Sequence, residues 1–320
     1  MNTALQTFIF VGSFLIILKA ADILVSGASS FAKRLRVSEI AIGLTVVAFG
    51  TSMPEFVVNL YSSFTGHNEI VFGNAVGSNI FNILLILGIS GLINPIRVKR
   101  NTTWKEIPFA LFTSILLLVL VNDVIIDNGA ENILTRIDGI VLLIFFIMFI
   151  IYTINIAKVR SLESSDIKDM SLAKSVVLMI LGVIGLALGG RTLTDSAVFL
   201  SRQMGISEKF ISFTVIAAGT SLPELATSAV AAYRKNSDIS VGNIVGSNIF
   251  NVLFILGFGA VIKDAPFLSV MNADLLVMTL ATTMLFVTMF VGKSHTIERK
   301  QAFLFLVSYI AYTVYLIIRR

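Results

Sequence analysis

The sequence lacks cysteine altogether, has one tryptophan and five prolines, and carries charge on only 13% of its 320 residues. Without cysteine, disulfides and thiol chemistry are excluded. A soluble domain has about twice that charged fraction. Because 56% of the residues are hydrophobic, the composition indicates an integral membrane protein.

Long apolar runs recur along the whole chain, and the longest polar stretch lies near its middle, from Arg160 to Lys174. Each run is long enough to cross a bilayer as a helix. We therefore predict an all-α integral membrane protein with ten transmembrane helices, divided into residues 1–158, a linker 159–172, and residues 173–320. The runs are 4–32, 39–65, 69–93, 106–123, 136–158, 173–203, 207–234, 238–262, 271–291 and 298–318.

The two halves contain an ungapped repeat. Adding 169 to a position between Ser38 and Gly88 gives its counterpart between Ser207 and Gly257, and about half of the paired residues are identical. With five helices per half, the second half enters the membrane upside down relative to the first. Such inverted repeats are typical of secondary transporters.

Lys and Arg residues are distributed unevenly over the predicted loops. With the N-terminus outside the cell, 16 of them lie in inside loops and six outside. This imbalance predicts a multi-pass protein of the cell membrane with both termini extracellular and the linker cytoplasmic. The net charge of +5 is then a topology signal, and we expect no nucleic-acid partner.

A six-residue pattern with a proline and a glutamate, Gly50–Glu55, returns as Gly219–Glu224 within an apolar helix of each half. Proline breaks the helix and frees backbone carbonyls beside the glutamate and its neighbouring hydroxyls. These are all oxygen ligands, which suit Na⁺ and Ca²⁺. The candidates in the two halves are Ala48, Thr51, Ser52 and Glu55, and Ala217, Thr220, Ser221 and Glu224.

A second pattern places polar side chains four residues apart on the helix that follows each glutamate. In each half the spacing predicts one polar stripe along one helix face. Glycines on these helices predict close contact with a neighbouring helix. Asn79 and Asn248 lie about 100° off the stripes, so we expect a structural role for them. The stripes are Asn74, Ser78 and Asn82, and Asn243, Ser247 and Asn251.

The predicted centre has two carboxylates, Glu55 and Glu224, among neutral oxygens. One Ca²⁺, two Na⁺ or two protons balance their charge of −2, and three Na⁺ slightly exceed it. Because the empty ionised site is costly in a low-dielectric interior, antiport is favoured over leak. Na⁺/Ca²⁺ exchange and Ca²⁺/H⁺ exchange both fit. A channel is disfavoured by the broken helices and a hydrolase by the lack of a nearby His or Lys base.

The paired motifs resemble those of the Ca²⁺/cation antiporter superfamily, particularly its prokaryotic Na⁺/Ca²⁺ exchangers. The resemblance covers the whole chain. It implies that helices two, three, seven and eight bind the ions and that helices one and six slide across them. It assigns Ca²⁺ chiefly to Glu55 and Glu224. It assigns Na⁺ to the carbonyls of Ala48 and Ala217 and to Thr51, Ser52, Ser78, Thr220, Ser221 and Ser247.

One residue departs from the pattern of that superfamily. Its members often have Asp at the position of Asn251, opposite the Asn at position 82, and here both are Asn. The partners implied are Ca²⁺ and Na⁺, with H⁺ or Li⁺ as further candidates, and the lipid bilayer. No prosthetic cofactor and no enzymatic activity are expected, and a monomer suffices for the mechanism.

Charged pairs also occur on the first and sixth predicted helices. Lys19 and Asp22 are three residues apart, and Arg191 and Asp195 are four apart. Such pairs can neutralise themselves near a membrane surface. The alternative hypothesis is that they influence the sliding of these helices.

Overall fold

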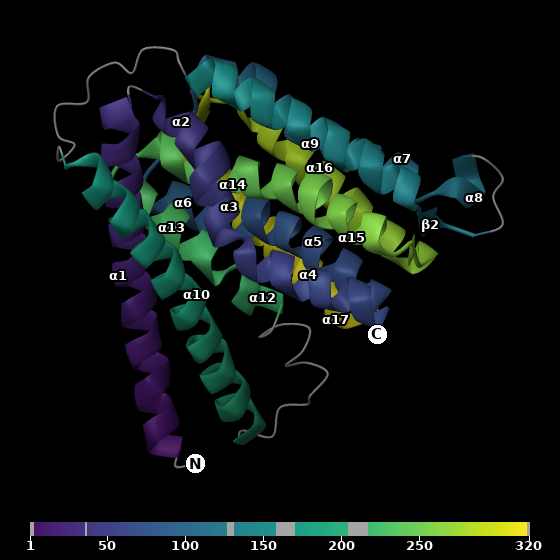
Figure 1. Ribbon diagram of the computed structural model, residues 1–320, viewed down its shortest axis with the longest axis horizontal. Coiled ribbons are helices and arrows are strands. Elements are labelled where there is room, and N and C mark those ends of the chain that lie inside the picture. The colour runs from purple at the N-terminus through teal and green to yellow at the C-terminus, as the bar shows by residue number, and fades with distance from the viewer. Residues whose placement is uncertain (1–2, 36, 127–130, 158–169, 204–216, 319–320) are drawn as a thin grey trace.

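The computed structural model describes residues 3–35, 37–126, 131–157, 170–203 and 217–318 (Figure 1). The prediction of an all-α membrane protein is confirmed. Within these ranges eight helices are long and apolar enough to cross a membrane, and a bent helix pair makes a ninth candidate span. The tenth predicted helix, 207–234, is described only from Ala217 onward, so the predicted count of ten is not established.

The unbroken helices carry most of the surface that faces outward. A π-helical turn, Thr102–Glu106, precedes α7, and a 3₁₀ turn, Ser269–Met271, precedes α16. The unbroken helices are α1 (Thr3–Leu35), α7 (Ile107–Leu120), α9 (Arg136–Ala157), α10 (Leu172–Gln203), α16 (Asn272–Thr288) and α17 (Arg299–Ile318). The short α8 (Asp123–Ile126) lies between α7 and α9 in the chain.

The repeated motifs lie on helices that are interrupted. The second predicted helix comprises α2 (Glu39–Ile42), a π-helical stretch (Gly43–Val47), α3 (Ala48–Thr51) and α4 (Met53–Thr65). The third comprises α5 (Asn68–Ile80), a π-helical stretch (Phe81–Ile86) and α6 (Leu87–Ile93). Their counterparts are α12 (Ala217–Thr220) and α13 (Leu222–Tyr233), then α14 (Ser237–Phe250), a π-helical stretch (Asn251–Leu256) and α15 (Gly257–Ile262).

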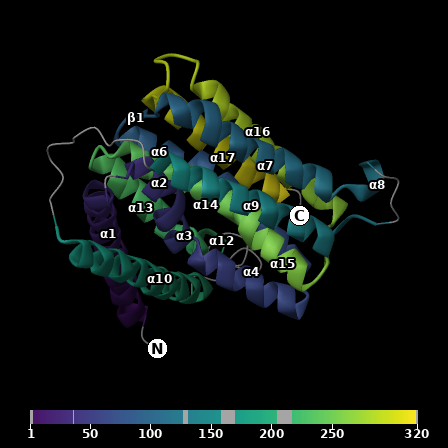
Figure 2. The ribbon, with the colours of Figure 1, turned by 45° about the horizontal axis from the view of Figure 1, so that its top comes forward.

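Helices α1 and α10 form a pair at one edge of the bundle (Figures 1 and 2), and in Figure 1 they extend beyond the other helices at the end where α1 begins. Glycines of α10 allow the close contact. A Cβ added at Gly182 would lie 2.7 Å from the Cβ of Leu24, and one at Gly185 would lie 2.8 Å from the Cβ of Ala20. The two helices therefore pack as a unit.

Two short antiparallel strand pairs connect the halves. Strand β1 (Ile96–Arg97) pairs with β4 (Thr296–Ile297), and β2 (Ile133–Leu134) pairs with β3 (Ala265–Pro266). We call the side where α1 begins and α4 ends the terminal side, and the side where α1 ends and α2 begins the linker side. Each strand pair contains one strand from each half, so the halves are joined outside the helical core as well as inside it.

The outer helices of the two halves also correspond. Tyr152 of α9 donates a hydrogen bond to Glu106, just before α7, and Tyr312 of α17 donates to Asp274 of α16 at 2.9 Å. In both halves, a tyrosine of the fifth helix thus contacts a carboxylate near the start of the fourth. This correspondence supports a shared fold for the halves.

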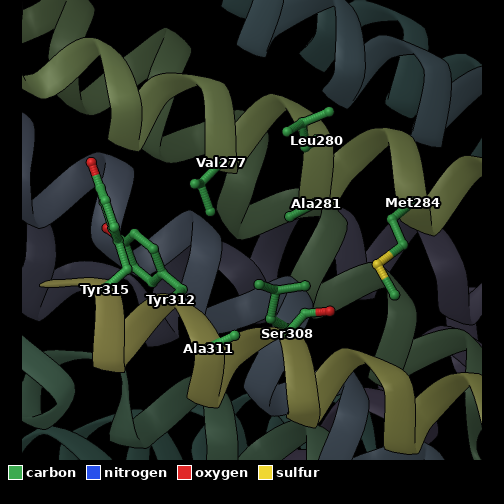
Figure 3. A pocket seen from close by; sticks show the side chains of 9 residues that line it. Val277, Leu280, Ala281, Met284, Ser308, Ala311, Tyr312 and Tyr315 are labelled. Atoms are coloured by element: carbon green, nitrogen blue, oxygen red, sulfur yellow. The ribbon is translucent and has the colours of Figure 1, made fainter.

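An apolar groove of about 360 Å³ lies between α16 and α17. In Figure 3, Tyr312 and Tyr315 lie at one end of it and Met284 lies at the other. Since it contains no carboxylate, it is not the predicted ion site. It is lined by Leu84, Val277, Leu280, Ala281, Met284, Ser308, Ala311, Tyr312 and Tyr315.

Candidate ion-binding site

Both glutamate motifs fold as the same broken helix. Residues 39–51 and 53–64 meet at a bend of 51°, and Pro54 lies in the first turn of α4, where its missing N–H costs no helical bond. Ser52, at the break, has φ −84° and ψ 9°, and its counterpart Ser221 has φ −88° and ψ 8°. The repeated sequence therefore produces a repeated backbone conformation.

Each serine at a break binds the glutamate of the other half. Ser52 Oγ donates to Glu224 Oε1 at 2.7 Å, and Ser221 Oγ donates to Glu55 Oε1 at 3.0 Å. The same hydroxyls lie 2.9 Å from the hydroxyls of Ser247 and Ser78, respectively. Both glutamates are 1% exposed. The two halves thus meet at one buried centre through reciprocal contacts.

The threonines beside these serines contact the amide stripes. Thr51 Oγ1 donates to Asn243 Oδ1 at 3.0 Å, and Thr220 Oγ1 donates to Asn74 Oδ1 at 3.4 Å. Asn74 Nδ2 in turn donates to the carbonyl of Glu55 at 3.1 Å. The equivalent bond from Asn243 Nδ2 to the carbonyl of Glu224 is 3.4 Å long. Hydroxyl and amide groups therefore fix both glutamate backbones.

The amides of Asn82 and Asn251 are oriented by Asn248 and Asn79. Asn82 Nδ2 donates to Asn248 Oδ1 at 2.9 Å, and Asn251 Nδ2 donates to Asn79 Oδ1 at 3.0 Å. Asn79 and Asn248 also donate to each other's backbone carbonyl, at 3.1 and 3.3 Å. The residues predicted to be structural therefore position the amides predicted to be ligands.

Among the described residues, four buried oxygens at this centre have no hydrogen-bond donor. They are Oε2 of Glu55, Oε2 of Glu224, Oδ1 of Asn82 and Oδ1 of Asn251. The π-helical stretch with Asn82 packs against α13, which carries Glu224, and the stretch with Asn251 packs against α4, which carries Glu55. An unsatisfied buried acceptor costs about 1–3 kcal/mol, and more if it is charged. A cation can satisfy all four.

The chemistry of this donor set suits a hard cation. The described residues contain no cluster of three or more His, Cys, Asp or Glu side chains, so carboxylates alone do not form the site. The two glutamates are supplemented by amide and hydroxyl oxygens, which are ligands that Ca²⁺ and Na⁺ accept.

The backbone at Ala48 differs from the prediction. Its carbonyl accepts the N–H of Ser52 at 3.0 Å, and the Thr51 hydroxyl, which donates its one proton to Asn243, lies 3.3 Å away. The expectation that it lacks a helical partner is wrong, because the helix continues normally to the break at Ser52. Ala48 keeps a second lone pair and remains a predicted ligand. Its counterpart Ala217 begins α12, and its role also remains a prediction.

Close helix contact at the glycines is observed in the second half. A Cβ added at Gly242 would lie 3.0 Å from the Cα of Gly43, and one at Gly246 would lie 2.6 Å from the carbonyl oxygen of Leu44. For the equivalent Gly73 and Gly77, the partners expected from the repeat are residues 212 and 213, which lie outside the described residues.

Three polar contacts that residues at and just beyond the end of α13 make with α1 could not be identified from the motifs. Arg234, at the end of α13, forms an ion pair with Asp22 and donates to Ser26 Oγ at 2.5 Å, both on α1. Asn236 donates to Ser29 at 3.0 Å. Arg234 and Asn236 lie beyond the glutamate motif, and no spacing rule connects them to the first helix.

These features define an integral membrane ion transporter whose two similar halves enclose one buried, oxygen-lined centre. The sequence profile of the family Sodium/calcium exchanger protein matches residues 5–155 and 174–318, and the chain belongs to this family. It is therefore an exchanger-type antiporter with Na⁺ and Ca²⁺ as transported ions, and not an enzyme.

Individual relatives cover nearly the whole chain. The uncharacterized membrane protein MJ0091 of Methanocaldococcus jannaschii is 35% identical, with 94% of each chain covered. The sodium/calcium exchanger MaX1 of Methanosarcina acetivorans is 28% identical, with 94% of this chain and 95% of the relative covered. The structure of the exchanger NCX_Mj soaked with 10 mM Na⁺ and zero Ca²⁺ superimposes with a TM-score of 0.84 at 34% identity, covering 98% of this chain and 99% of that one.

Proposed function

We propose that the protein exchanges Na⁺ for Ca²⁺ at the centre between Glu55 and Glu224 by alternating access. The observation that carries the proposal is the set of four unpartnered buried oxygens, two from each half. Two carboxylates buried to this degree are costly when both are ionised and no cation is bound between them. The protein therefore changes between its two access states with cations bound at the centre.

In this proposal Ca²⁺ and Na⁺ use different ligands. Ca²⁺ needs charge compensation and six to eight oxygens, so Glu55 and Glu224 are its main ligands. Na⁺ can be held by neutral oxygens around them. In this proposal Asn82 and Asn251 complete the middle of the centre. The Na⁺ ligands are Thr51, Ser52, Ser78, Thr220, Ser221, Ser247 and the carbonyls of Ala48 and Ala217.

The pair α1 and α10 is the moving element in this mechanism. It packs as a unit and stands at one edge of the bundle (Figure 1). Small, closely packed residues join α1 to α10, and α1 also contacts α13 through apolar residues such as Ala226 and through the ion pair of Asp22 with Arg234. Sliding of this pair would expose the centre to one side and then to the other.

We also infer the arrangement in the membrane. The excess of Lys and Arg in the linker-side loops places that side in the cytoplasm and both termini outside the cell. Residues 1–158 and 173–320 form the two inverted units. The structure describes only Met170, Ser171 and Leu172 of the linker, residues 159–172.

Isotope-labelled Ca²⁺ flux in proteoliposomes tests the function. Gradients of Na⁺, Li⁺, K⁺ and pH are imposed one at a time on the full-length protein. We expect Ca²⁺ uptake that requires an opposed Na⁺ gradient. Uptake that ignores Na⁺ and follows a pH jump would overturn Na⁺ coupling and identify Ca²⁺/H⁺ exchange. Equal uptake without any gradient would contradict antiport.

A further inference from the structure

In the part of the chain that the structure describes, one buried amide outside the centre has no hydrogen-bond partner. Asn59 of α4 is 1% exposed, and neither its Oδ1 nor its Nδ2 has a partner. A buried amide without partners costs about 1–3 kcal/mol for each unsatisfied group. None of the contacts described above accounts for Asn59.

The position of Asn59 relates it to the ion centre. It follows Glu55 by four residues on the uninterrupted helix α4, so it lies on the same helix face. One turn of helix separates the two side chains by about 6 Å along the axis, in the direction of the terminal side. Asn74 of the adjacent α5 bonds to the Glu55 carbonyl, so α5 presents a polar side chain beside the turn that carries Glu55.

The equivalent position in the other half is fully satisfied. Ser228 accepts a hydrogen bond from Asn243 Nδ2 at 3.0 Å and donates to the carbonyl of Ser240 at 3.4 Å. Ser240 Oγ donates back to the Ser228 carbonyl at 3.0 Å. The counterpart of Ser240 is Val71, which has no hydroxyl, so the first half cannot form this cluster.

We propose that Asn59 is a ligand for the transported cation on the path between Glu55 and the terminal side. Its Oδ1 replaces one water of a partly hydrated Ca²⁺ or Na⁺, and its Nδ2 donates to a water that the ion retains. At the equivalent position on the linker side no amide is available to the ion, because Ser228 uses its own polar groups within its cluster. This inference rests on the proposed exchange function and adds a binding residue used from one side only.

Ca²⁺ uptake into right-side-out and inverted membrane vesicles tests the proposal with full-length protein. The variant Asn59→Leu removes the amide at similar volume. We expect the apparent KM for Ca²⁺ to rise about fivefold to tenfold when Ca²⁺ enters from the terminal side, consistent with the loss of one oxygen ligand. The KM for Ca²⁺ that enters from the linker side should not change. Asn59→Asp should lower the KM on the same side.

Controls separate this role from a structural one. Thr227→Val removes a buried unpartnered hydroxyl from α13, in the other half, and should leave the KM on the terminal side unchanged. If Asn59→Leu raises the melting temperature and leaves both KM values unchanged, the proposal is wrong. An equal KM change on both sides would also overturn it. Asn59→Ser introduces the serine found at the equivalent position of the other half, Ser228. If Asn59→Leu does not fold, Asn59→Ser should raise the KM for Ca²⁺ on the terminal side about twofold.

A failure of the exchange proposal can be distinguished from a failure of the Asn59 proposal. Wild-type uptake in the same vesicles reports whether Na⁺ drives Ca²⁺ transport at all. Ca²⁺-dependent thermal stabilisation of purified wild-type and Asn59→Asp protein then measures binding without transport. If the Ca²⁺ concentration that gives half of the stabilisation is the same in both, Asn59 does not contact the ion.

Discussion

Glu55 and Glu224 have matching hydrogen-bond partners, whereas the residues one turn beyond them do not match. Each glutamate accepts a serine hydroxyl from the opposite half and keeps one oxygen free. One turn further, Ser228 is enclosed by hydrogen bonds, but Asn59 has none. The repeat therefore preserves the centre where ions bind and permits differences along the two paths that lead to it.

The largest expected effect concerns the residues that match most closely. Glu55→Gln and Glu224→Gln each remove one of the two charges that balance Ca²⁺, and each should reduce Ca²⁺ transport by about 100-fold or more, beyond the value of one neutral hydrogen bond. Isotope-labelled Ca²⁺ uptake measures this. Glu131→Gln, at an exposed residue, is the control and should transport normally. Substantial transport by either Gln variant would show that the two carboxylates are not both needed.

A smaller effect tests whether the reciprocal serine bonds are equivalent. Ser52→Ala and Ser221→Ala each remove the hydroxyl that binds the opposite glutamate. A hydrogen bond to a charged group contributes about 1.5–3 kcal/mol, so each variant should bind Ca²⁺ roughly 10–100-fold more weakly, and by a similar factor. Binding is measured by Ca²⁺-dependent thermal stabilisation, with Ser308→Ala, at a half-buried serine of α17 away from the centre, as control. Loss in only one serine variant would contradict the equivalence of the halves.

The amide pairs give the next comparison. Asn251 donates to Asn79, and Asn82 donates to Asn248. In Asn251→Asp or Asn82→Asp, a carboxylate oxygen would face an amide oxygen unless the carboxyl carries a proton. Both variants should therefore make Ca²⁺ exchange about fivefold more sensitive to pH than the wild type and should alter its Na⁺ dependence.

Exchange rates in mildly acidic and mildly alkaline buffers, at several Na⁺ concentrations, measure this effect. Asn251→Leu is the control, because it removes the amide without adding a titratable group. Identical pH and Na⁺ dependence in Asn251→Asp and the wild type would show that the Asn79–Asn251 bond does not restrict residue 251.

The smallest expected effect contrasts the ion centre with the helix pair at its edge. Asp22→Asn removes the ion pair with Arg234, which joins α1 to the end of α13. Partly exposed ion pairs contribute about 1 kcal/mol or less, so turnover should change by roughly twofold to fivefold, with Ca²⁺ affinity unchanged. Asp195→Asn is the matched control, because Asp195 pairs at 3.9 Å with Arg191 of its own helix. An unchanged turnover in Asp22→Asn would end the idea that this contact affects sliding.

The repeated sequence was sufficient to predict much of the centre. A proline next to a glutamate predicts a broken helix with a buried carboxylate, and the 169-residue offset predicts the same structure twice. Ser52 and Ser221 were therefore identified together with their glutamates, and both lie at the observed breaks. Repetition also predicts that the two copies face each other, which the reciprocal hydrogen bonds agree with.

Contacts outside the motifs could not be predicted, for two physical reasons. Helical spacing assumes a regular α-helix, but π-helical stretches begin at Phe81 and Asn251 and alter which side chains share a face. In addition, the amides that Asn79 and Asn248 orient, Asn251 and Asn82, belong to the opposite half, which spacing within one helix does not indicate. The second reason is that packing between distant helices, such as Asp22 against Arg234, depends on tertiary structure and has no local pattern.

The strand pairs β1–β4 and β2–β3 have a consequence for how the protein can be assembled. Each takes one strand from residues before the linker and one from residues after it, so the attachment between halves does not depend on the covalent connection. Two separately synthesised polypeptides, divided within residues 159–172, should associate in the membrane and recover exchange. A gene split at this point would then still encode a working exchanger.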